Sequence, residues 1–534
     1  MSQAASDAPV VIAGAGPVGL SLALGLGHHG VRSIVLERKR ELDPHSRALG
    51  ILPRTMEVFR AWGVLEPFIQ AGRLLTRVSV WQVGKAEPQL TLDLGAVQGR
   101  LTATPGVLIL PQDSTEAILL DLVRARGLAD VRLGHEVVGV RDDAGGVVVE
   151  ARDTTGGRHE LRGSILVGCD GAHSRVRTEL GWSLEGKTYP ARVLLADVRL
   201  RDARDALPWP RLAGRARGVL AAVQYRPEHW RIICTLETGQ AADVAESEPF
   251  VAGLVDELFG PGPFEPVWSS AFNIHCRTSP GFRRGAVLLA GDAAHINSPT
   301  GGQGMNAGIH DAHNLAWKLA RALDGGDAGT LLASYEQERR AAVQDNVERY
   351  TDLLTRLAFL TGPLVRRVLV PVAKLAVGQP LLLRRIMPRA AMLDTRYRRS
   401  SILVGTDRLV GARAPDGELD DASGRRLRLH DLASREAALI LFDDGRLPGW
   451  SRADVEPAVR DVPGVRIVRL RPAGADLQAG DVRDSSGRLW QDWRATGETC
   501  ALVRPDAHVG WLARRPAPEE IRRSVARAMG APAG

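Results

Sequence analysis

A short glycine-rich turn near the N-terminus constrains the fold more than any other stretch of the chain. The apolar run Val10–Ala13 predicts a buried strand, and Ser33–Leu36 predicts a second strand after a helix that ends near His29. A GxGxxG pattern stands where the first strand meets the helix. This order predicts a βαβ unit of the kind that binds dinucleotides, and therefore an α/β protein built on a Rossmann-like parallel sheet.

Each glycine of the pattern has its own physical reason. The first permits a tight turn, the second lets the backbone approach a pyrophosphate, and the third lets the helix pack on the strand. The helix N-terminus offers free N–H groups to phosphate. An acid directly after the second strand can accept hydrogen bonds from a ribose diol, which suits the unphosphorylated ribose of FAD or NAD. The expected cofactor-binding residues of this unit are Gly14, Gly16, Pro17, Gly19, Glu37 and Arg38.

Two further acids follow predicted strands. The strand that begins at Ile165 ends in Cys169-Asp170-Gly171, and the apolar run Ala286–Ala290 ends in Gly291-Asp292. Each acid alone could be an ordinary helix N-cap. Their shared place at the carboxyl end of a strand, followed by small residues, is where α/β sheets bind ligands. The sequence therefore predicts that Asp170 and Asp292 belong to one site.

The second of these motifs opens the glycine-rich stretch GDAAHINSPTGGQGMN, which leads into a helix. Glycine costs about 0.5–1 kcal/mol relative to alanine in regular structure, so the backbone here is expected to pass close to something. His295 lies inside this stretch, and the sequence leaves open whether its role is structural or catalytic.

Composition excludes several classes of protein. The 534 residues suggest two to four domains, and 44% hydrophobic with 25% charged residues is ordinary for a globular protein. The net charge of +7 is carried almost entirely by arginine, which reflects either compositional bias or attraction of anionic cofactors. No basic stripe with interleaved aromatic residues is present, so a nucleic-acid partner is not expected.

Cysteine usage and the apolar segments point to a cytoplasmic protein. The four cysteines form no CxxC pair, which argues against a zinc site and a disulfide framework and fits a reducing cytoplasm. We expect no metal. The N-terminus has no cationic region typical of a signal peptide. The apolar segment Leu357–Leu383 is interrupted by prolines and basic residues, so we interpret it as packed helices, with a membrane-surface role as the lesser alternative.

A block of alternating strands follows the Asp170-Gly171 motif and predicts an antiparallel sheet that would form the substrate pocket. The strands are expected at Arg192–Leu200, Gly218–Tyr225, His229–Glu237 and Val267–Arg277, with Leu75–Val83 as a further edge. Candidate substrate contacts, each with the alternative of an ordinary sheet residue, are Gln224, Tyr225, Asn273 and His275.

From about Ser401 the pattern changes to strand, helix, strand, hairpin and closing helix. This order predicts a thioredoxin-like domain. Because its only cysteine is Cys500, thiol exchange is not expected, and we interpret the domain as a structural or dimer-contact module.

The sequence resembles the group A flavoprotein monooxygenases, the FAD-dependent aromatic hydroxylases. The resemblance rests on the GxGxxG turn, the Asp170-Gly171 motif and the Gly291-Asp292 motif, in this order. Further stretches match the family as well, and the resemblance covers essentially the whole chain. It is strongest to the larger members that act on phenols and polycyclic aromatic polyketides, which carry an extra C-terminal domain.

The resemblance implies roles by position. Glu37 would hold the adenosine ribose, Arg47 and Gln112 would face the adenosine and pyrophosphate side, and Asp292 would accept from the ribityl chain. Asp170 would serve both the FAD site and reduction by a transiently bound nicotinamide cofactor, NADPH or NADH. The glycine-rich loop would pass the flavin ring, and the N–H groups of the following helix would stabilise reduced flavin. The loop residues implied are Pro299, Gly301, Gly302, Gly304, Met305 and Asn306.

The implied activity is that of an FAD-dependent monooxygenase. NAD(P)H would reduce the flavin, O2 would add to give a C4a-hydroperoxyflavin, and one oxygen would reach a phenolic or polycyclic polyketide-type ring. No catalytic base is identified. Two alternatives remain: Baeyer–Villiger oxygen insertion on a related ketone, and a non-catalytic flavin-binding partner protein. The expected partners are a small aromatic substrate and O2, without nucleic acid or membrane, in a monomer or homodimer.

These inferences predict a discontinuous domain organisation. The FAD-binding domain is expected at residues 1–74, 101–185 and 285–350, and the substrate-binding sheet domain at 75–100 and 186–284. A helical connection is expected at 351–400, followed by the thioredoxin-like domain without CxxC at 401–534.

Overall fold

The fold is described from a computed structural model of the 534-residue chain. The structure describes residues 8–44, 48–143, 145–213, 218–237, 239–298, 301–348, 351–352, 355, 379–445 and 452–532. Arg47 and Pro299, two of the expected cofactor residues, lie outside these ranges, as does most of the apolar segment Leu357–Leu383.

A six-stranded sheet forms the centre of the molecule, in the order β18-β19-β12-β1-β2-β8. All neighbouring pairs are parallel except β18 with β19. The central strands β1, β12 and β19 are buried on both faces, which explains why the sequence shows continuous apolar runs there rather than alternation. Their bounds are β1 (Val10–Ala13), β2 (Ser33–Glu37), β8 (Ala129–Leu133), β12 (Ile165–Gly168), β18 (Arg283–Arg284) and β19 (Val287–Leu289).

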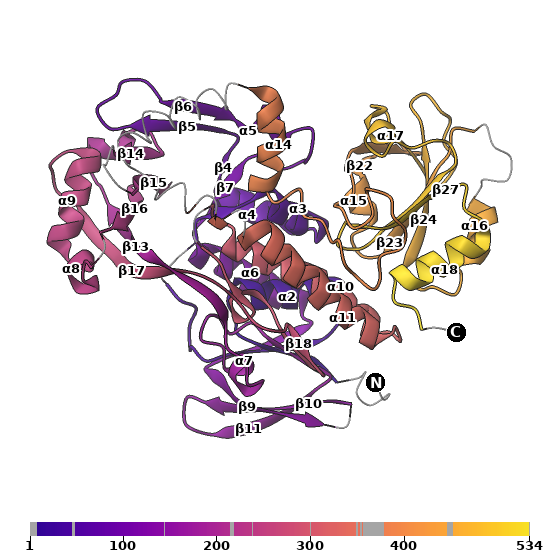
Figure 1. The fold of residues 1–534 in the computed structure, drawn as a ribbon, viewed down its shortest axis with the longest axis horizontal. Helices are drawn as coiled ribbons and strands as arrows, with labels where there is room; N and C mark the ends of the chain where they lie inside the picture. The colour runs from indigo at the N-terminus through magenta and orange to yellow at the C-terminus, as the bar shows by residue number, and fades with distance from the viewer. Residues whose placement is uncertain are drawn as a thin grey trace.

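This sheet lies between two layers, and the largest hydrophobic core cluster extends into both. One layer consists of the helices α2 (Pro17–His28), α6 (Gln112–Arg126) and α10 (Gly304–Leu323). The other is a three-stranded antiparallel sheet of β9 (His135–Asp143), β10 (Gly146–Asp153) and β11 (Arg158–Gly163), with the short helix α7 (Arg175–Glu179) beside it (Figure 1).

A second sheet of eight strands has the order β20-β17-β13-β16-β15-β14-β5-β6. We predicted that Leu75–Val83 adds the edge, but β6 lies outside β5 and takes that place. The helices α8 (Ala242–Glu246) and α9 (Glu248–Phe259) cover the face turned away from the first sheet (Figure 1). The strand bounds are β5 (Arg77–Gln82), β6 (Leu90–Asp93), β13 (Glu185–Arg199), β14 (Arg211–Ala213), β15 (Leu220–Arg226), β16 (His229–Leu236), β17 (Glu265–Thr278) and β20 (His295–Ile296).

A third sheet of seven strands forms the C-terminal domain, in the order β22-β21-β25-β24-β23-β26-β27. Parallel β23 and β24 are joined through α16, and β26 and β27 form an antiparallel hairpin before α18. The order β24-β23-β26-β27 is thioredoxin-like, as the sequence predicted. The bounds are β21 (Glu418–Asp421), β22 (Arg426–Arg428), β23 (Ala437–Phe442), α16 (Arg452–Val459), β24 (Val465–Arg471), β25 (Asp481–Arg483), α17 (Arg488–Asp492), β26 (Thr499–Val503), β27 (Val509–Arg514) and α18 (Pro518–Ala528).

Smaller elements connect these three sheets. A three-stranded sheet of order β3-β7-β4 lies beside the first sheet, and α11 packs on α10. The bounds are β3 (Gly50–Ile51), α3 (Pro53–Ala61), α4 (Leu65–Ala71), β4 (Arg73–Leu75), α5 (Leu94–Gln98), β7 (Val107–Ile109), the 3-10 helices η1 (Ala203–Ala206) and η2 (Gly291–Ala293), α11 (Ala328–Ala342), the π-helix η3 (Val343–Glu348), α14 (Pro380–Ala390) and α15 (Leu429–Leu432).

A buried ionic cluster joins the C-terminal domain to the helices of the first domain. Glu338 of α11 accepts hydrogen bonds from Lys318 Nζ of α10 (2.7 Å) and from Arg504 Nη1 (2.6 Å) and Nη2 (2.9 Å). Arg504 also pairs with Asp506, and Asn314 donates to both carboxylates. All four charged side chains are at most 1% exposed. Charges this deeply buried are stable only when they are paired.

We predict that Glu338→Gln strongly lowers the stability of the whole chain. The change leaves Lys318 and Arg504 buried without their shared carboxylate, which costs about 3–5 kcal/mol. The matched control is Glu519→Gln, which breaks the exposed pair with Arg522 on α18 and should leave the unfolding midpoint close to that of wild type. Chemical denaturation followed by circular dichroism measures both. Equal shifts of the two midpoints would show that the cluster does not hold the domains together.

Candidate active site

The first glycine turn is compressed on one side and open on the other. Gly14 has φ +103°, and a Cβ there would lie 2.4 Å from the carbonyl oxygen of Cys169. A Cβ on Gly19 would lie 2.0 Å from the carbonyl oxygen of Gly14. A Cβ on Gly16 would meet nothing within 4 Å. The structure thus requires glycine at the first and third positions for packing, whereas the second faces open space that a ligand can enter.

The N-terminus of α2 opens onto the same space. Gly16 is the N-cap and no side chain caps the helix, so its first N–H groups are available to an anion. Glu37, at the end of β2, accepts hydrogen bonds from the N–H groups of Ala15 (2.8 Å) and Lys39 (3.0 Å). The carboxylate is therefore held across the turn, where the sequence places a ribose contact. Arg38 is exposed beside it.

Asp170 uses only one of its two carboxylate oxygens within the described part of the chain. Its Oδ2 accepts from the N–H groups of Arg175 (2.7 Å) and Val176 (3.1 Å), which caps the start of α7. Its Oδ1 is buried and has no hydrogen-bond partner among the described residues. A buried carboxylate oxygen without a protein donor can accept from a ligand or an ordered water. Capping of α7 therefore uses Oδ2 of Asp170, and Oδ1 is the oxygen that a ligand could bind.

The Gly-Asp motif forms the 3-10 turn η2 directly after β19, and Asp292 is exposed on it. Arg177 links this turn to the Asp-Gly motif, because Nη1 donates to the carbonyl of Ala293 (3.0 Å) and Nη2 to that of Ala172 (2.8 Å). Since β1, β12 and β19 are parallel neighbours, their carboxyl ends meet at one edge. The structure thus brings the three sequence motifs together.

A buried carboxylate on α10 fixes this turn from behind. Asp311 Oδ2 accepts from Gly291 N (2.9 Å) and pairs with His295 Nε2 (2.8 Å), and its Oδ1 accepts from Arg339 Nε (2.7 Å). Burial alone would raise the pKa of Asp311, but His295 and Arg339 overcome it and hold this pKa well below its usual range. His295 is 1% exposed and its ring nitrogens bond Asp311 and Asn297, which favours the structural alternative.

The glycine-rich loop reaches α10 with left-handed backbone. Gly301 has φ +94° and Gly302 has φ +65°, and a Cβ on Gly302 would meet nothing within 4 Å. Asn306 ties the loop down: its Nδ2 donates to the carbonyls of Gly302 (2.8 Å) and Gly50 (3.0 Å). No side chain caps α10, and its first residues, Gly304 and Met305, are half-buried. The helix N-terminus is open beside a fixed loop.

The four predicted substrate contacts do not share one face of the second sheet. Strand register places Gln224, Asn273 and His275 on the α8/α9 side of the second sheet or at its rim. Gln224 donates to Asp205, and His275 bonds Thr188. Only Tyr225, displaced by a bulge, reaches the opposite face, where it lies beside Arg231. The side chains that do line this face are apolar, a row that alternation alone could not assign to one side: Val193, Leu195, Ile233, Trp268, Phe272 and Ile274.

The residues that fix the site from behind were not identified from the sequence. Asp311, Arg177 and Arg339 make the decisive contacts, and each stands in a stretch that reads as an ordinary polar position on a helix. The one available signal was polar side chains at Asp311 and Asn314 on the same side of an apolar helix.

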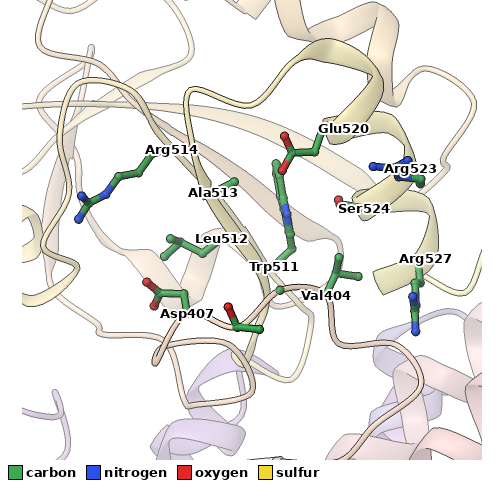
Figure 2. A pocket seen from close by; sticks show the side chains of 12 residues that line it. Val404, Asp407, Trp511, Leu512, Ala513, Arg514, Glu520, Arg523, Ser524 and Arg527 are labelled. Atoms are coloured by element: carbon green, nitrogen blue, oxygen red, sulfur yellow. The ribbon is translucent and has the colours of Figure 1, made fainter.

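A surface hollow of about 490 Å³ lies in the C-terminal domain, far along the chain from these motifs. Figure 2 shows Trp511 between the β27 strand and the α18 residues Glu520, Ser524 and Arg523. Cys500 is fully buried in this domain, and burial raises the pKa of its thiol well above the usual value. The thiol is thus neutral and shielded from solvent.

A dinucleotide cofactor is bound by open helix N-termini and by acids at the strand ends, and this site has both. Fold and site therefore define an FAD-binding oxidoreductase. Residues 7–350 match the model of the FAD binding domain, and residues 407–532 match that of the C-terminal part of aromatic-ring hydroxylases. The chain belongs to the family of FAD-dependent aromatic-ring hydroxylases, the group A flavoprotein monooxygenases.

Individual relatives agree with this assignment. The chain is 33% identical over 484 residues to the rifampicin monooxygenase of Streptomyces venezuelae, covering 88% of this chain and 95% of that protein. The OxyS anhydrotetracycline hydroxylase of Streptomyces rimosus superposes with a TM-score of 0.77 at 31% identity, covering 99% of this chain and 100% of that one. Aklavinone-11 hydroxylase, solved with FAD and aklavinone, superposes with a TM-score of 0.81 at 25% identity. The superposition covers 98% of this chain and 99% of that one.

Within the described residues, every helix is too short or too polar to cross a membrane.

We predict that alanine at two glycines of the first turn has different effects. Gly14→Ala forces a left-handed backbone and a clash with Cys169, so the melting temperature falls whether or not FAD is present. Gly16→Ala meets no protein atom and has an ordinary φ of −73°, so the apoprotein melts as wild type but binds FAD more weakly. Thermal melts of apoprotein and flavin titrations measure both. Normal FAD affinity in Gly16→Ala would contradict the placement of the pyrophosphate.

Proposed function

We propose that this protein uses FAD, NADPH or NADH, and O2 to hydroxylate an aromatic substrate of phenolic or polycyclic polyketide type. The observation that carries the proposal is that the second sheet adjoins the Gly-Asp turn through β20, and that its apolar face is the one that α8 and α9 leave uncovered. The relatives named for rifampicin, anhydrotetracycline and aklavinone support this substrate class.

The residues present fit FAD. The open space at Gly16 and the uncapped start of α2 suit the pyrophosphate, and Glu37 suits the ribose. The partnerless oxygen of Asp170 suits a donor from a ligand. Asp292 would accept from the ribityl chain. When bound and reduced, FAD supplies oxygen activation at its C4a carbon.

The residues of the chain would position the substrate, exclude water from it and stabilise charge on the flavin. The apolar row on β13, β16 and β17 excludes water from the reacting ring, which suppresses loss of activated oxygen as hydrogen peroxide. The uncapped N-terminus of α10 would stabilise negative charge on the reduced ring, by about 0.3–1 kcal/mol and up to ~2 when partly buried. Beside this face, Asp197 holds Arg231 in a buried two-bond pair at 2.7 Å, which neutralises both charges next to the substrate space.

A substrate screen tests the proposal. Holoenzyme is mixed with NADPH or NADH and a panel of phenols and polycyclic aromatic compounds, and nicotinamide oxidation is recorded with mass spectrometry of the products. The expected result is substrate-stimulated oxidation and a product carrying one added hydroxyl oxygen. Ring-expanded esters or lactones would instead support Baeyer–Villiger insertion. Bound FAD with neither basal nor stimulated oxidation would support a non-catalytic flavin-binding partner.

We predict that Gly302→Val uncouples the reaction more than it weakens FAD binding. A β-branched side chain at φ +65° adds strain of about 1–3 kcal/mol at the loop that precedes α10. FAD affinity depends mainly on the distant dinucleotide end, so flavin stays bound while reduction slows and hydrogen peroxide per NAD(P)H rises.

The control for this loop variant is Gly424→Val, which places the same side chain at an open glycine with φ +81° in the β21–β22 turn. Its peroxide yield should equal that of wild type. Loss of flavin from Gly302→Val with normal peroxide yield would show that this loop does not lie at the flavin ring.

A further inference from the structure

A buried carboxyl group stands behind one of the expected FAD contacts. Glu116 lies on α6, one turn after Gln112, and is 5% exposed. The Nε2 of Gln112 donates to Glu116 Oε1 at 2.8 Å. With Nε2 turned to this carboxyl, the amide oxygen of Gln112 faces the other way and accepts from the N–H of Ala48 at 3.3 Å. Glu116 and the N–H of Ala48 therefore hold the two ends of the Gln112 amide.

The same amide holds the segment that carries another expected contact. Gln112 N donates to the carbonyl of Ala48 at 3.0 Å. Gln112 therefore binds both the carbonyl and the N–H of Ala48, the first through its backbone and the second through its side chain. Ala48 directly follows Arg47 in the sequence. A chain of contacts thus runs from the buried Glu116 through Gln112 to the segment expected on the adenosine and pyrophosphate side.

The charges around Glu116 are mostly negative. Among the described residues, Glu37 at the end of β2 and Asp43 in the following loop add negative charge to its surroundings, and Lys39, which is paired with Asp43, acts in the opposite sense. Arg126, at the far end of α6, bonds the carbonyls of Leu24 and Trp62 instead. An ionised Glu116 would add a further negative charge to a region meant to receive an anionic cofactor.

Burial, with Asp43 and Glu37, raises the pKa of Glu116 to about 7, against the opposing effect of its hydrogen bond from Gln112. Protein without FAD therefore holds a mixture of neutral and ionised Glu116 near neutral pH. The negatively charged pyrophosphate of FAD raises this pKa further, because it adds negative charge to the same edge. By linkage, FAD binds more tightly to the neutral form, and its affinity falls as the pH rises above about 7.

Resting on the proposed FAD-dependent function, we propose that Glu116 is a positioning residue of the FAD site: its carboxyl holds the amide of Gln112 for the cofactor and takes up a proton as FAD binds. The step involves one proton from solvent, which forms an O–H bond on the Glu116 carboxylate. Nothing is oxidised or reduced.

The test uses apoprotein and FAD, without any substrate. FAD affinity is measured by quenching of flavin fluorescence between about pH 6 and pH 8.5 for wild type, Glu116→Gln, Glu116→Ala and the control Asp121→Asn. Asp121 is exposed on the same helix. Calorimetry near pH 7.5 in two buffers of different ionisation enthalpy counts the protons taken up. If Glu116 had a purely structural role, wild type and Glu116→Gln would take up the same number of protons.

The expected results are specific to each variant. In wild type and Asp121→Asn, the Kd for FAD rises at least about threefold across this pH range and binding takes up a fraction of a proton. Glu116→Gln keeps the low-pH affinity at every pH and takes up no proton there. Glu116→Ala, which cannot orient Gln112, binds more weakly than Glu116→Gln at all pH values.

Two results would overturn the proposal. One is a Glu116→Gln variant with the wild-type pH dependence and proton uptake, which would assign both to another group. The other is a folded Glu116→Ala variant that binds FAD as tightly as Glu116→Gln. If Glu116→Ala fails to fold, the isosteric Glu116→Gln comparison still decides, because it keeps an acceptor oxygen for Gln112 but removes the exchangeable proton.

Discussion

The carboxylate of Asp311 is the interaction on which the site depends. It is completely buried, and it binds the backbone N–H of the Gly-Asp turn, the ring of His295 and the guanidinium of Arg339. A charge in this position is stable only with all its partners present, so the turn, α10 and α11 are fixed together. The edge that receives FAD is therefore built from behind by a helix that has no residue in the GxGxxG turn.

The same helix extends this control to the C-terminal domain. Further along α10, Asn314 and Lys318 join the buried cluster of Glu338, Arg504 and Asp506. Asp311 and Glu338 thus share two helices, α10 and α11, with one carboxylate fixing the FAD edge and the other fixing the thioredoxin-like domain. We interpreted that domain from sequence as a structural or dimer-contact module, and the cluster supports the structural role. Dimer contact stays a prediction.

Local chemistry allowed much of this to be predicted. The GxGxxG turn, the two acids after strands and the thioredoxin-like order are encoded within short stretches, because each depends on strand ends, helix starts and backbone freedom. For the second sheet, it was harder to predict on which face a side chain lies. Alternation does not say which of its two faces a strand turns toward the first sheet, and the structure places Gln224, Asn273 and His275 on the α8/α9 side or at the rim. The buried charges were not found, since a polar residue on a helix reads as exposed until its distant partner is known.

The central claim, that α10 builds the FAD edge through Asp311, is tested most directly by the FAD affinity of Asp311→Asn. The variant keeps the shape of the side chain but removes the charge shared by His295 and Arg339. Affinity is measured by flavin fluorescence well below the melting temperature, with circular dichroism to confirm the fold. The account predicts a folded protein whose Kd for FAD is raised at least about tenfold, or about 1.4 kcal/mol. Wild-type affinity in this variant would contradict it.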